Sequence, residues 1–342
     1  MQISRYALRT GLVLATASHL ASAQSSSPMM KAVVVHEYGG PEVLKLEKVP
    51  WPEPKEDEIR VRVVAAGVNP VDALIRSGVF AKFFKSKLPL VPGYDIAGTV
   101  EKAGAKVTKF KVGDPVFAYI GVKEGGGYAE YAVASENEAA AKPKSLNYIE
   151  AAAVPVAGLT AWQALIDTAK LSSGQTVLIH GGSGGVGSFA IQIAKARGAR
   201  VIATASTQNQ DLLKQLGADI AIDYTTTKFE EVAKDVDVVL DSVGTDTLTR
   251  SYGVLKKGGY VVSLVAKPDA RELEQFGIHG SPINVQPNSD ELAALGKLID
   301  EKKIRVIVSQ VLPLADASKA QAQAETHHTR GKIVLKVADD PK

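Results

Sequence analysis

The strongest chemical motif of the sequence is a glycine-rich turn between an apolar run and a helical pattern. The apolar run ends at His180, and the helical pattern covers residues 188–195. Glycine at 184 and 185 lets a backbone approach a pyrophosphate closely, and Gly187 lets helix and strand pack tightly. A structural turn without a ligand is the alternative. Free N–H groups in the first helical turn favour phosphate binding. The expected dinucleotide site comprises Ser183, Gly184, Gly185, Val186 and Gly187.

The end of the next strand bears on the choice between NADH and NADPH. NAD enzymes place an acid there, against the ribose 2′-hydroxyl. This strand ends within residues 203–207 and has no acid before Asp211. The small hydroxyl of Ser206 leaves room for a 2′-phosphate and does not repel it. No Arg or Lys directly follows Ser206, and Lys214 is a partner for the phosphate only if its helix presents it correctly. We expect NADPH as the cofactor.

Two kinds of periodicity surround this motif. From Lys31 to about Tyr148, short apolar alternations broken by Gly and Pro predict an irregular, mostly β domain. From Thr160 onward, continuous apolar runs alternate with helical stretches, which predicts a doubly wound parallel sheet. Its expected strands are 177–180, 201–205, 220–222, 236–240, 260–265 and, as a sixth, 283–285. The expected helices include 189–197, 208–216 and an amphipathic helix at 290–301.

The last part of the chain returns to the β character of the first part. Residues 308–312 and 332–337 both read as strands. The nucleotide domain is therefore expected to be inserted between two parts of the first domain.

The composition indicates a globular protein with a small-molecule partner. Hydrophobic residues make up 45% of the chain, charged residues 23%, and the net charge is +3. Such a chain lacks the broad positive charge that nucleic-acid binding requires. It has no cysteine, which excludes disulfides, thiolate nucleophiles and cysteine-ligated metal.

The first residues resemble a secretory signal. Arg5 and Arg9 precede an apolar run over 11–20, and Ala23 ends a small-x-small sequence typical of a cleavage site. Cleavage after Ala23 predicts an exported, periplasmic protein. The alternative is translation from Met29 or Met30, which predicts a cytoplasmic one. No other apolar run reaches about 18 residues, so the mature chain is expected to have no membrane span.

Five short motifs occur in the order found in quinone oxidoreductases. They are AGVNPVD at 66–72, PGYDIAG at 92–98, GLTAW at 158–162, GGVG at 184–187 and DSVG at 241–244. From about Met30 to Val337 the chain resembles the zinc-independent quinone oxidoreductase and enone reductase family of the medium-chain dehydrogenase/reductase superfamily. The resemblance implies an α/β fold with a GroES-like irregular β domain and a Rossmann doubly wound parallel-sheet domain. The expected division is a signal peptide at 1–23, a linker at 24–30, a GroES-like catalytic domain at 31–153, an NADP-binding Rossmann domain at 154–302 and a return to the catalytic domain at 303–342.

The resemblance also implies roles for individual side chains. Asn69, Asp72 and Tyr94 would be catalytic residues at the nicotinamide end of a cleft, with Tyr128 lining it. Structural alternatives stay open, because Asp72 can simply cap a helix and Tyr94 can simply pack. The implied cofactor contacts outside the turn are Lys82, Thr160, Ser206, Tyr224, Ser242, Gly244, Val265, Gly331 and Lys332. His180 is expected to be packed, and the adjacent residues His327 and His328 to lie in a loop.

No metal site is expected. Zinc-dependent alcohol dehydrogenases of the superfamily have Cys where this chain has Asn69, and Gly-His-Glu where it has Gly93, Tyr94 and Asp95. Without a metal to stabilise charge on oxygen, a conjugated acceptor is favoured, because a quinone or enone delocalises that charge. The expected reaction is NADPH-dependent hydride transfer to a quinone or enone. The alternatives are a non-catalytic, crystallin-like NADPH-binding protein and an enoyl-thioester reductase. A homodimer formed through the sheet edge at 283–285 is also expected.

Overall fold

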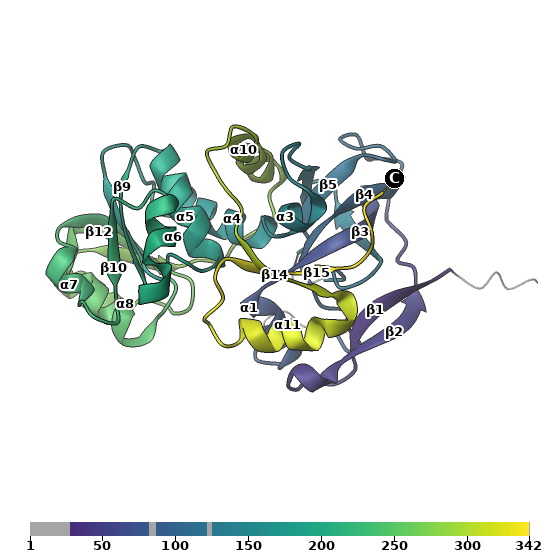
Figure 1. Cartoon of the computed structure of the whole chain (residues 1–342), viewed down its shortest axis with the longest axis horizontal. Coiled ribbons are helices and arrows are strands. Elements are labelled where there is room, and N and C mark those ends of the chain that lie inside the picture. The colour runs from purple at the N-terminus through teal and green to yellow at the C-terminus, as the bar shows by residue number, and fades with distance from the viewer. Residues whose placement is uncertain (1–27, 82–86, 122–124, 342) are drawn as a thin grey trace, which may run out of the picture.

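The computed structural model describes residues 28–81, 87–121 and 125–341. Two sheets dominate it, joined by short helices (Figure 1). Lys82 and the expected signal peptide at 1–23 lie outside the described residues.

One sheet is six-stranded, in the order β10-β9-β8-β11-β12-β13, and every neighbouring pair in it is parallel. On β8 the side chains of Val177 and Ile179 pack into one apolar core, and Leu178 between them packs into another. Because both faces are covered, the strand is apolar from Val177 to Ile179. The strands are β8 (Thr176–Ile179), β9 (Arg200–Ala205), β10 (Ile220–Asp223), β11 (Val236–Asp241), β12 (Leu255–Ser263) and β13 (His279–Pro282).

Helices alternate with these strands along the chain. The helix α5 (Gly185–Ala196) follows β8 directly and contributes Phe189, Ile191 and Ile193 to the core that also contains Val177. The helix α8 (Thr245–Tyr252) lies on the opposite face, where Leu248 packs in the same core as Leu178. The other helical segments are η3 (Thr207–Asn209), α6 (Gln210–Gln215), α7 (Phe229–Val232) and α9 (Ala270–Phe276).

The other main sheet has seven strands and combines both ends of the chain. Its order is β14-β15-β3-β4-β5-β7, and β6 also pairs with β3. Figure 1 shows β14 and β15, in yellow, next to β3, and β15 pairs with β3 in antiparallel register. The strands are β3 (Glu58–Val68), β4 (Asp95–Ala103), β5 (Pro115–Tyr119), β6 (Tyr131–Ser135), β7 (Ala139–Ala141), β14 (Val308–Pro313) and β15 (Lys332–Lys336). A separate hairpin comprises β1 (Met29–Val35) and β2 (Leu44–Pro50).

Further helices lie beside and between the two sheets. The helix α4 (Pro155–Trp162) is buried over nearly its whole length and continues into a π-helical segment, η2 (Gln163–Thr168). The remaining helical segments are η1 (Pro41–Val43), α1 (Pro70–Arg76), α3 (Tyr148–Ala152), α10 (Ser289–Asp300), η4 (Leu314–Asp316) and α11 (Ala317–Ala324). The predicted fold class, a GroES-like β domain with a parallel Rossmann sheet, is confirmed.

Two sequence predictions differ from the structure. The sixth parallel strand is His279–Pro282, so its prediction at 283–285 was wrong. Residues 283 and 285 instead pack against the main core with partly buried side chains, which explains why they are apolar without being a strand. The linker prediction at 24–30 is too long, because Met29 already begins β1 and Met30 is buried there.

Candidate active site

The glycine-rich turn leaves the beginning of α5 open. Gly184 precedes the helix, and no side chain of the described residues caps this end. A Cβ atom at Gly184 would have only the Gly181 carbonyl oxygen nearby, at 3.4 Å, so the backbone here is accessible to a ligand. At Gly187 a Cβ atom would lie 2.3 Å from that same oxygen, so only glycine allows the helix to pack against the turn. These features fit a pyrophosphate group.

The C-terminal strand segment passes directly over this turn. The Gly331 amide donates a 2.8 Å hydrogen bond to the Ser183 carbonyl, and Gly331 forms a parallel bridge with Gly184. The next residue, Lys332, places its Cδ atom 3.0 Å from the position that a Cβ of Gly185 would occupy. The glycine-rich turn and the segment that begins β15 are therefore joined by a backbone hydrogen bond and by side-chain packing.

The side chain of Lys332 ends in a buried polar cluster. Its Nζ donates to Asn69 Oδ1 at 2.5 Å and to Asp95 Oδ2 at 3.1 Å. Asn69 Nδ2 donates to the same Asp95 oxygen at 2.8 Å, and the Val156 amide donates to Asp95 Oδ1 at 2.7 Å. Because an ammonium group only donates, the oxygen of the Asn69 amide must be the atom that faces Lys332. The Lys332 and Asp95 side chains are 5% and 0% exposed, so this is a buried ion pair with fixed geometry.

The carboxyl group of Asp72 lies beside this cluster and is fully buried. Its Oδ2 accepts hydrogen bonds from the Tyr128 hydroxyl at 2.5 Å and from the backbone amide of Asn69 at 2.9 Å. Its Oδ1 is buried with no hydrogen-bond partner among the described residues. Burial raises the pKa of Asp72 to about 7, against the opposing effect of the Tyr128 and Asn69 hydrogen bonds and of the Lys332 charge. Its charge therefore changes near neutral pH.

Tyr94 completes this end of the site as a neutral phenol. It is 1% exposed and packs against Gly125, whose Cβ position lies 3.3 Å from the Tyr94 ring. Burial raises its pKa, and the nearby Asp72 and Tyr119 raise it further. Its hydroxyl therefore keeps its proton over the physiological range.

The other end of the predicted cofactor path lies where β9 and β10 end. Ser206 Oγ accepts a 3.1 Å hydrogen bond from Asn209 Nδ2. The Tyr224 amide donates a 3.3 Å hydrogen bond to the carbonyl oxygen of Ala205, the residue before Ser206, and Tyr224 is 54% exposed. The Lys214 ammonium lies 3.9 Å from the Asp211 carboxylate of its own helix. Sequence reasoning overlooked Asp223, which pairs with Ala205 across the two strands. Hydrogen bonds from Thr225 and Thr207 hold its pKa below the ordinary range.

Other predicted contacts lie along the ends of β11 and β12. Asp241 Oδ1 accepts hydrogen bonds from the amides of Val243 and Gly244, which shapes the loop before α8. Gly244 has a φ of +75°, and its Cβ position would clash with Val265, which is 59% exposed. Thr160, another predicted cofactor contact, lies in α4, and its hydroxyl donates a hydrogen bond to the Val156 carbonyl of the same helix.

Comparison with known proteins places the chain in a family. The model described as "Alcohol dehydrogenase GroES-like domain" matches residues 55–144, and the model described as "Zinc-binding dehydrogenase" matches residues 216–335. An NADPH-dependent alkenal/one oxidoreductase of Arabidopsis thaliana chloroplasts is 40% identical over 94% of this chain and 83% of its own length. The chain belongs to the quinone oxidoreductase and enone reductase family of the medium-chain dehydrogenases/reductases.

Solved structures agree with this membership. The quinone oxidoreductase from Coxiella burnetii is 40% identical and superposes with a TM-score of 0.85 over 91% of this chain and 100% of its own. A mycobacterial member solved in complex with NADPH is 32% identical, with a TM-score of 0.81 over 90% of this chain and 100% of its own.

Among the residues that the structure describes, no group of three or more His, Cys, Asp or Glu side chains could hold a metal ion. In this member Asn69 and Asp95 are held by the ammonium group of Lys332. Asp95 was part of a motif noted in the sequence, yet it was not predicted as a site residue. Its signal was its position directly after Tyr94 at the start of a strand, since a carboxylate buried there needs a partner.

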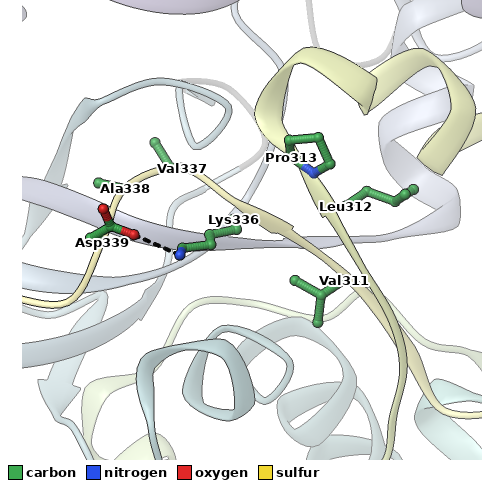
Figure 2. A pocket seen from close by; sticks show the side chains of 7 residues that line it. All are labelled: Val311, Leu312, Pro313, Lys336, Val337, Ala338 and Asp339. Carbon is green, nitrogen blue, oxygen red and sulfur yellow. Dashed lines mark hydrogen bonds and ion pairs between the residues drawn. The ribbon is translucent and has the colours of Figure 1, made fainter.

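The contacts of Gly331 and Lys332 connect the glycine-rich turn with Asn69, while two hollows on the surface lie elsewhere. Figure 2 shows one of them, bordered by Val311, Pro313 and the 2.6 Å ion pair between Lys336 and Asp339. None of the predicted site residues lines it, and the polar cluster is the better candidate because Asp72, a carboxyl group with a raised pKa, lies beside it.

Proposed function

We propose that this protein is an NADPH-dependent reductase of quinones and conjugated enones that works without a metal ion. The observation that carries this proposal is the contact between Gly331 and Ser183, next to the buried cluster of Lys332, Asn69 and Asp95. It brings the phosphate-binding turn and the polar residues of the β domain into one site. The names of the Arabidopsis and Coxiella relatives support both classes of acceptor.

The turn from Ser183 to Gly187 would hold the pyrophosphate through the open N-terminus of α5. Ser206 and Tyr224 would face the adenosine phosphate, and Ser242, Gly244 and Val265 would border the path between the two ends. Bound NADPH would supply the hydride that reduces the acceptor. The name of the Arabidopsis relative and the NADPH complex of the mycobacterial member support NADPH as the cofactor.

The polar cluster would act on the reacting end of the acceptor. Asn69 is fixed with its Nδ2 toward Asp95, and its second N–H remains available as a donor. Tyr94 keeps its proton, and Asp72 can carry one near neutral pH. Fixed donors of this kind stabilise negative charge as it develops on oxygen. A conjugated acceptor spreads that charge, so these donors are sufficient without a Lewis acid.

Two properties of the residues argue against zinc at this place. The chain has no cysteine, so a thiolate ligand cannot be supplied from any position. The Lys332 ammonium already pairs with Asp95 and Asn69, and its charge would repel a divalent cation.

We infer the following assembly for the whole chain. Residues 31–153 and 303–342 form the catalytic domain, since β14 and β15 share a sheet with β3. Residues 154–302 form the NADP-binding domain.

The edge strand β13 supports a homodimer, because it has a sheet neighbour on one side only. None of the relatives named above is described as periplasmic, so export depends on the leader prediction alone. Among the described residues, no helix is long and apolar enough to cross a membrane.

One panel assay tests the proposal. NADPH oxidation is followed by absorbance with naphthoquinones, alkenals, cyclic enones and enoyl thioesters of increasing chain length. Steady turnover with quinones or short enones is expected. NADPH binding without turnover on any acceptor would indicate a non-catalytic binding protein. A strong preference for long-chain thioesters would indicate an enoyl-thioester reductase.

A further inference from the structure

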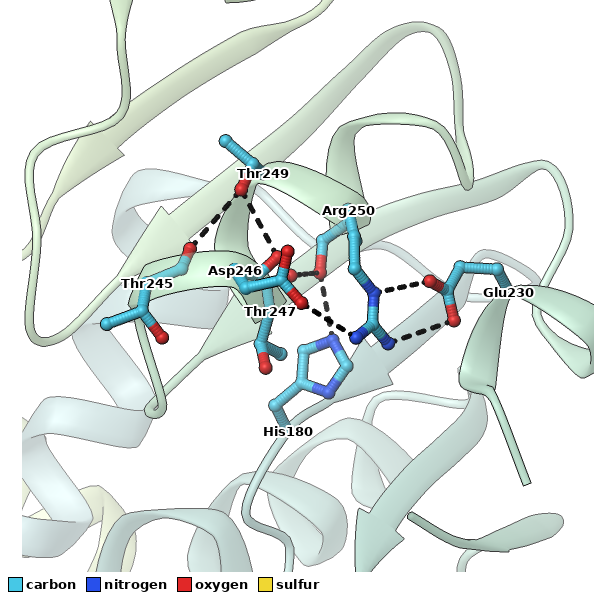
Figure 3. Close-up of polar contacts among 8 residues, drawn as sticks. His180, Glu230, Thr245, Asp246, Thr247, Thr249 and Arg250 are labelled. Carbon is cyan, nitrogen blue, oxygen red and sulfur yellow. Dashed lines mark hydrogen bonds and ion pairs between the residues drawn. The ribbon is translucent and has the colours of Figure 1, made fainter. Parts of the chain in front are cut away.

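His180 is the last residue before the phosphate-binding turn, and its ring is buried between the parallel sheet and α8. It is 2% exposed, and its ring packs edge-on against Phe229 at a centroid distance of 4.6 Å. Figure 3 shows the ring beside residues of α8. Its Nδ1 lies 3.2 Å from Thr204 Oγ1, and its Nε2 lies 3.0 Å from Ser251 Oγ. Both ring nitrogens therefore have one hydroxyl partner each.

The hydrogen bonds around the ring determine which nitrogen carries the proton. Ser251 Oγ donates its single proton to the Thr247 carbonyl oxygen at 2.6 Å, and a carbonyl oxygen can only accept. Ser251 must then accept from the ring, so the proton is on Nε2. In a neutral ring Nδ1 is an acceptor, so Thr204 must donate its hydroxyl proton to it.

The surroundings keep the ring neutral. Burial is the largest effect and lowers the pKa of His180 to about 4, and the charge of Arg250 lowers it further. The carboxylates of Asp241 and Glu230 oppose this shift. Glu230 is, however, bound to Arg250 by two hydrogen bonds, as Figure 3 shows, so its charge is largely compensated.

Thr204 connects the His180 ring to the glycine-rich turn through hydrogen bonds. Its carbonyl oxygen accepts from the Gly182 amide at 2.9 Å, and its Oγ1 accepts from the Gly181 amide at 3.4 Å. Ser242 Oγ donates to the His180 carbonyl oxygen at 2.8 Å. A directed series of hydrogen bonds thus runs from the first amide of the turn through Thr204 and His180 to α8.

We propose that His180 is a positioning residue for cofactor binding. Its tautomer with the proton on Nε2 orients the Thr204 hydroxyl, and Thr204 holds the Gly181 and Gly182 amides in the shape that receives the pyrophosphate. The functional part rests on the proposed NADPH site, whereas the tautomer does not, and the two are tested separately.

The tautomer is tested by NMR on the full-length protein labelled with ¹⁵N-histidine and without cofactor. The His180→Asn variant identifies the His180 resonances by their absence. We expect a protonated Nε2 and an unprotonated Nδ1, with no titration from about pH 8 down to about pH 5. A proton on Nδ1, or a ring that titrates near its ordinary pKa, would overturn the proposal.

The positioning role is tested by comparing two amides at position 180. Asparagine places its oxygen near the Nδ1 position and can still accept from Thr204. Glutamine places its amide nitrogen near the Nε2 position and can only replace the bond to Ser251. We expect His180→Gln to weaken NADPH binding, measured by fluorescence titration, roughly three- to tenfold, and His180→Asn to weaken it less.

Thermal unfolding of the same variants separates positioning from packing. The smaller asparagine leaves the larger cavity, so its Tm should fall further than that of the glutamine variant. Affinity that simply follows Tm would contradict the proposal.

Thr204→Val removes the hydroxyl with little change in volume and should weaken NADPH binding as much as His180→Gln does. Unchanged affinity in Thr204→Val would also overturn it. A parent protein that fails to bind NADPH refutes the proposed function, while the NMR experiment still decides the tautomer.

Discussion

The Tyr128 hydroxyl donates a 2.5 Å hydrogen bond to the Oδ2 atom of Asp72, while the Oδ1 atom of the same carboxyl group is buried with no partner in the part of the chain that the structure describes. Such an arrangement favours a protonated carboxyl group, because an ionised one would leave a charged oxygen unsolvated. The protonated form of Asp72 therefore persists to a higher pH than that of an exposed carboxyl group, although the Asn69 backbone amide and the charge of Lys332 oppose this shift.

Asp72→Asn should remove a pH dependence of stability. Burial raises the pKa of Asp72 from its ordinary value of 3.8 to about 7, so the folded protein holds a proton that the unfolded chain releases between these values. The free energy of unfolding of the parent should fall as pH rises from about 4 to about 7, by up to roughly 4 kcal/mol. The neutral asparagine should abolish this slope in urea unfolding. The exposed Asp211→Asn is the matched control and should keep it. An identical slope in parent and Asp72→Asn would contradict the assigned pKa.

Lys332→Met should destabilise the fold by about 3–5 kcal/mol, because it leaves the fully buried Asp95 without its cation. Urea unfolding measures the loss. The double variant Lys332→Met with Asp95→Asn should recover much of it, since no buried charge remains. If the double variant is no more stable than the single one, the ion pair is not the cause.

Ser206→Asp should reverse the preference for NADPH over NADH, because a carboxylate at the end of β9 repels the 2′-phosphate. Fluorescence titration of both cofactors into parent and variant measures the preference. Ser206→Asn, which has similar volume and no charge, is the control and should reverse nothing. Equal affinity of the parent for the two cofactors would show that Ser206 does not select between them.

Exhaustive chelation should leave the NADPH oxidation rate unchanged, because the chain has no thiolate ligand and the Lys332 ammonium occupies the oxygen ligands at Asn69 and Asp95. Turnover is measured with a naphthoquinone before and after dialysis against a chelator. A rate that falls on chelation and returns with zinc would refute metal independence.

Sedimentation at micromolar concentration should show a dimer that pairs through β13 of each copy. The Ile283 amide bonds inward to the Ser263 carbonyl, so by alternation along the strand the N–H and C=O groups of Gly280 point outward. Val285 lies beyond this strand, so Val285→Pro should leave a dimer intact. A monomeric parent would show that the edge is left unpaired in solution.

The sequence predicted the central strands of the parallel sheet well, because most residues of β8, β9 and β11 are apolar and buried. It missed β13, whose residues His279–Pro282 have no apolar pattern. This segment is a strand because its backbone bonds to β12, and an edge position does not require apolar side chains. Only the fold could show this pairing.

The site was predictable in its residue types and not in its contacts. The glycine turn could be identified from local spacing, since its strand, turn and helix are contiguous. Lys332 was assigned to the cofactor through the family resemblance, and the structure shows its ammonium bound to Asp95, 237 positions earlier. Asp95 was missed because its partners Asn69, Val156 and Lys332 lie far from it in the sequence, and Asp223 was missed because its pairing with Ala205 depends on the register of the sheet.

The passage of Gly331 and Lys332 over the glycine turn has a consequence for synthesis of the chain. Asn69 is made 263 positions before the lysine that fixes its side chain, and at typical elongation rates this interval lasts on the order of 10 to 50 s. Once residues 184–187 have been made, a nascent chain contains the turn and β3, but Asp95 still lacks its cation. A ribosome-bound intermediate should therefore be unable to complete its cofactor site until β15 has been translated.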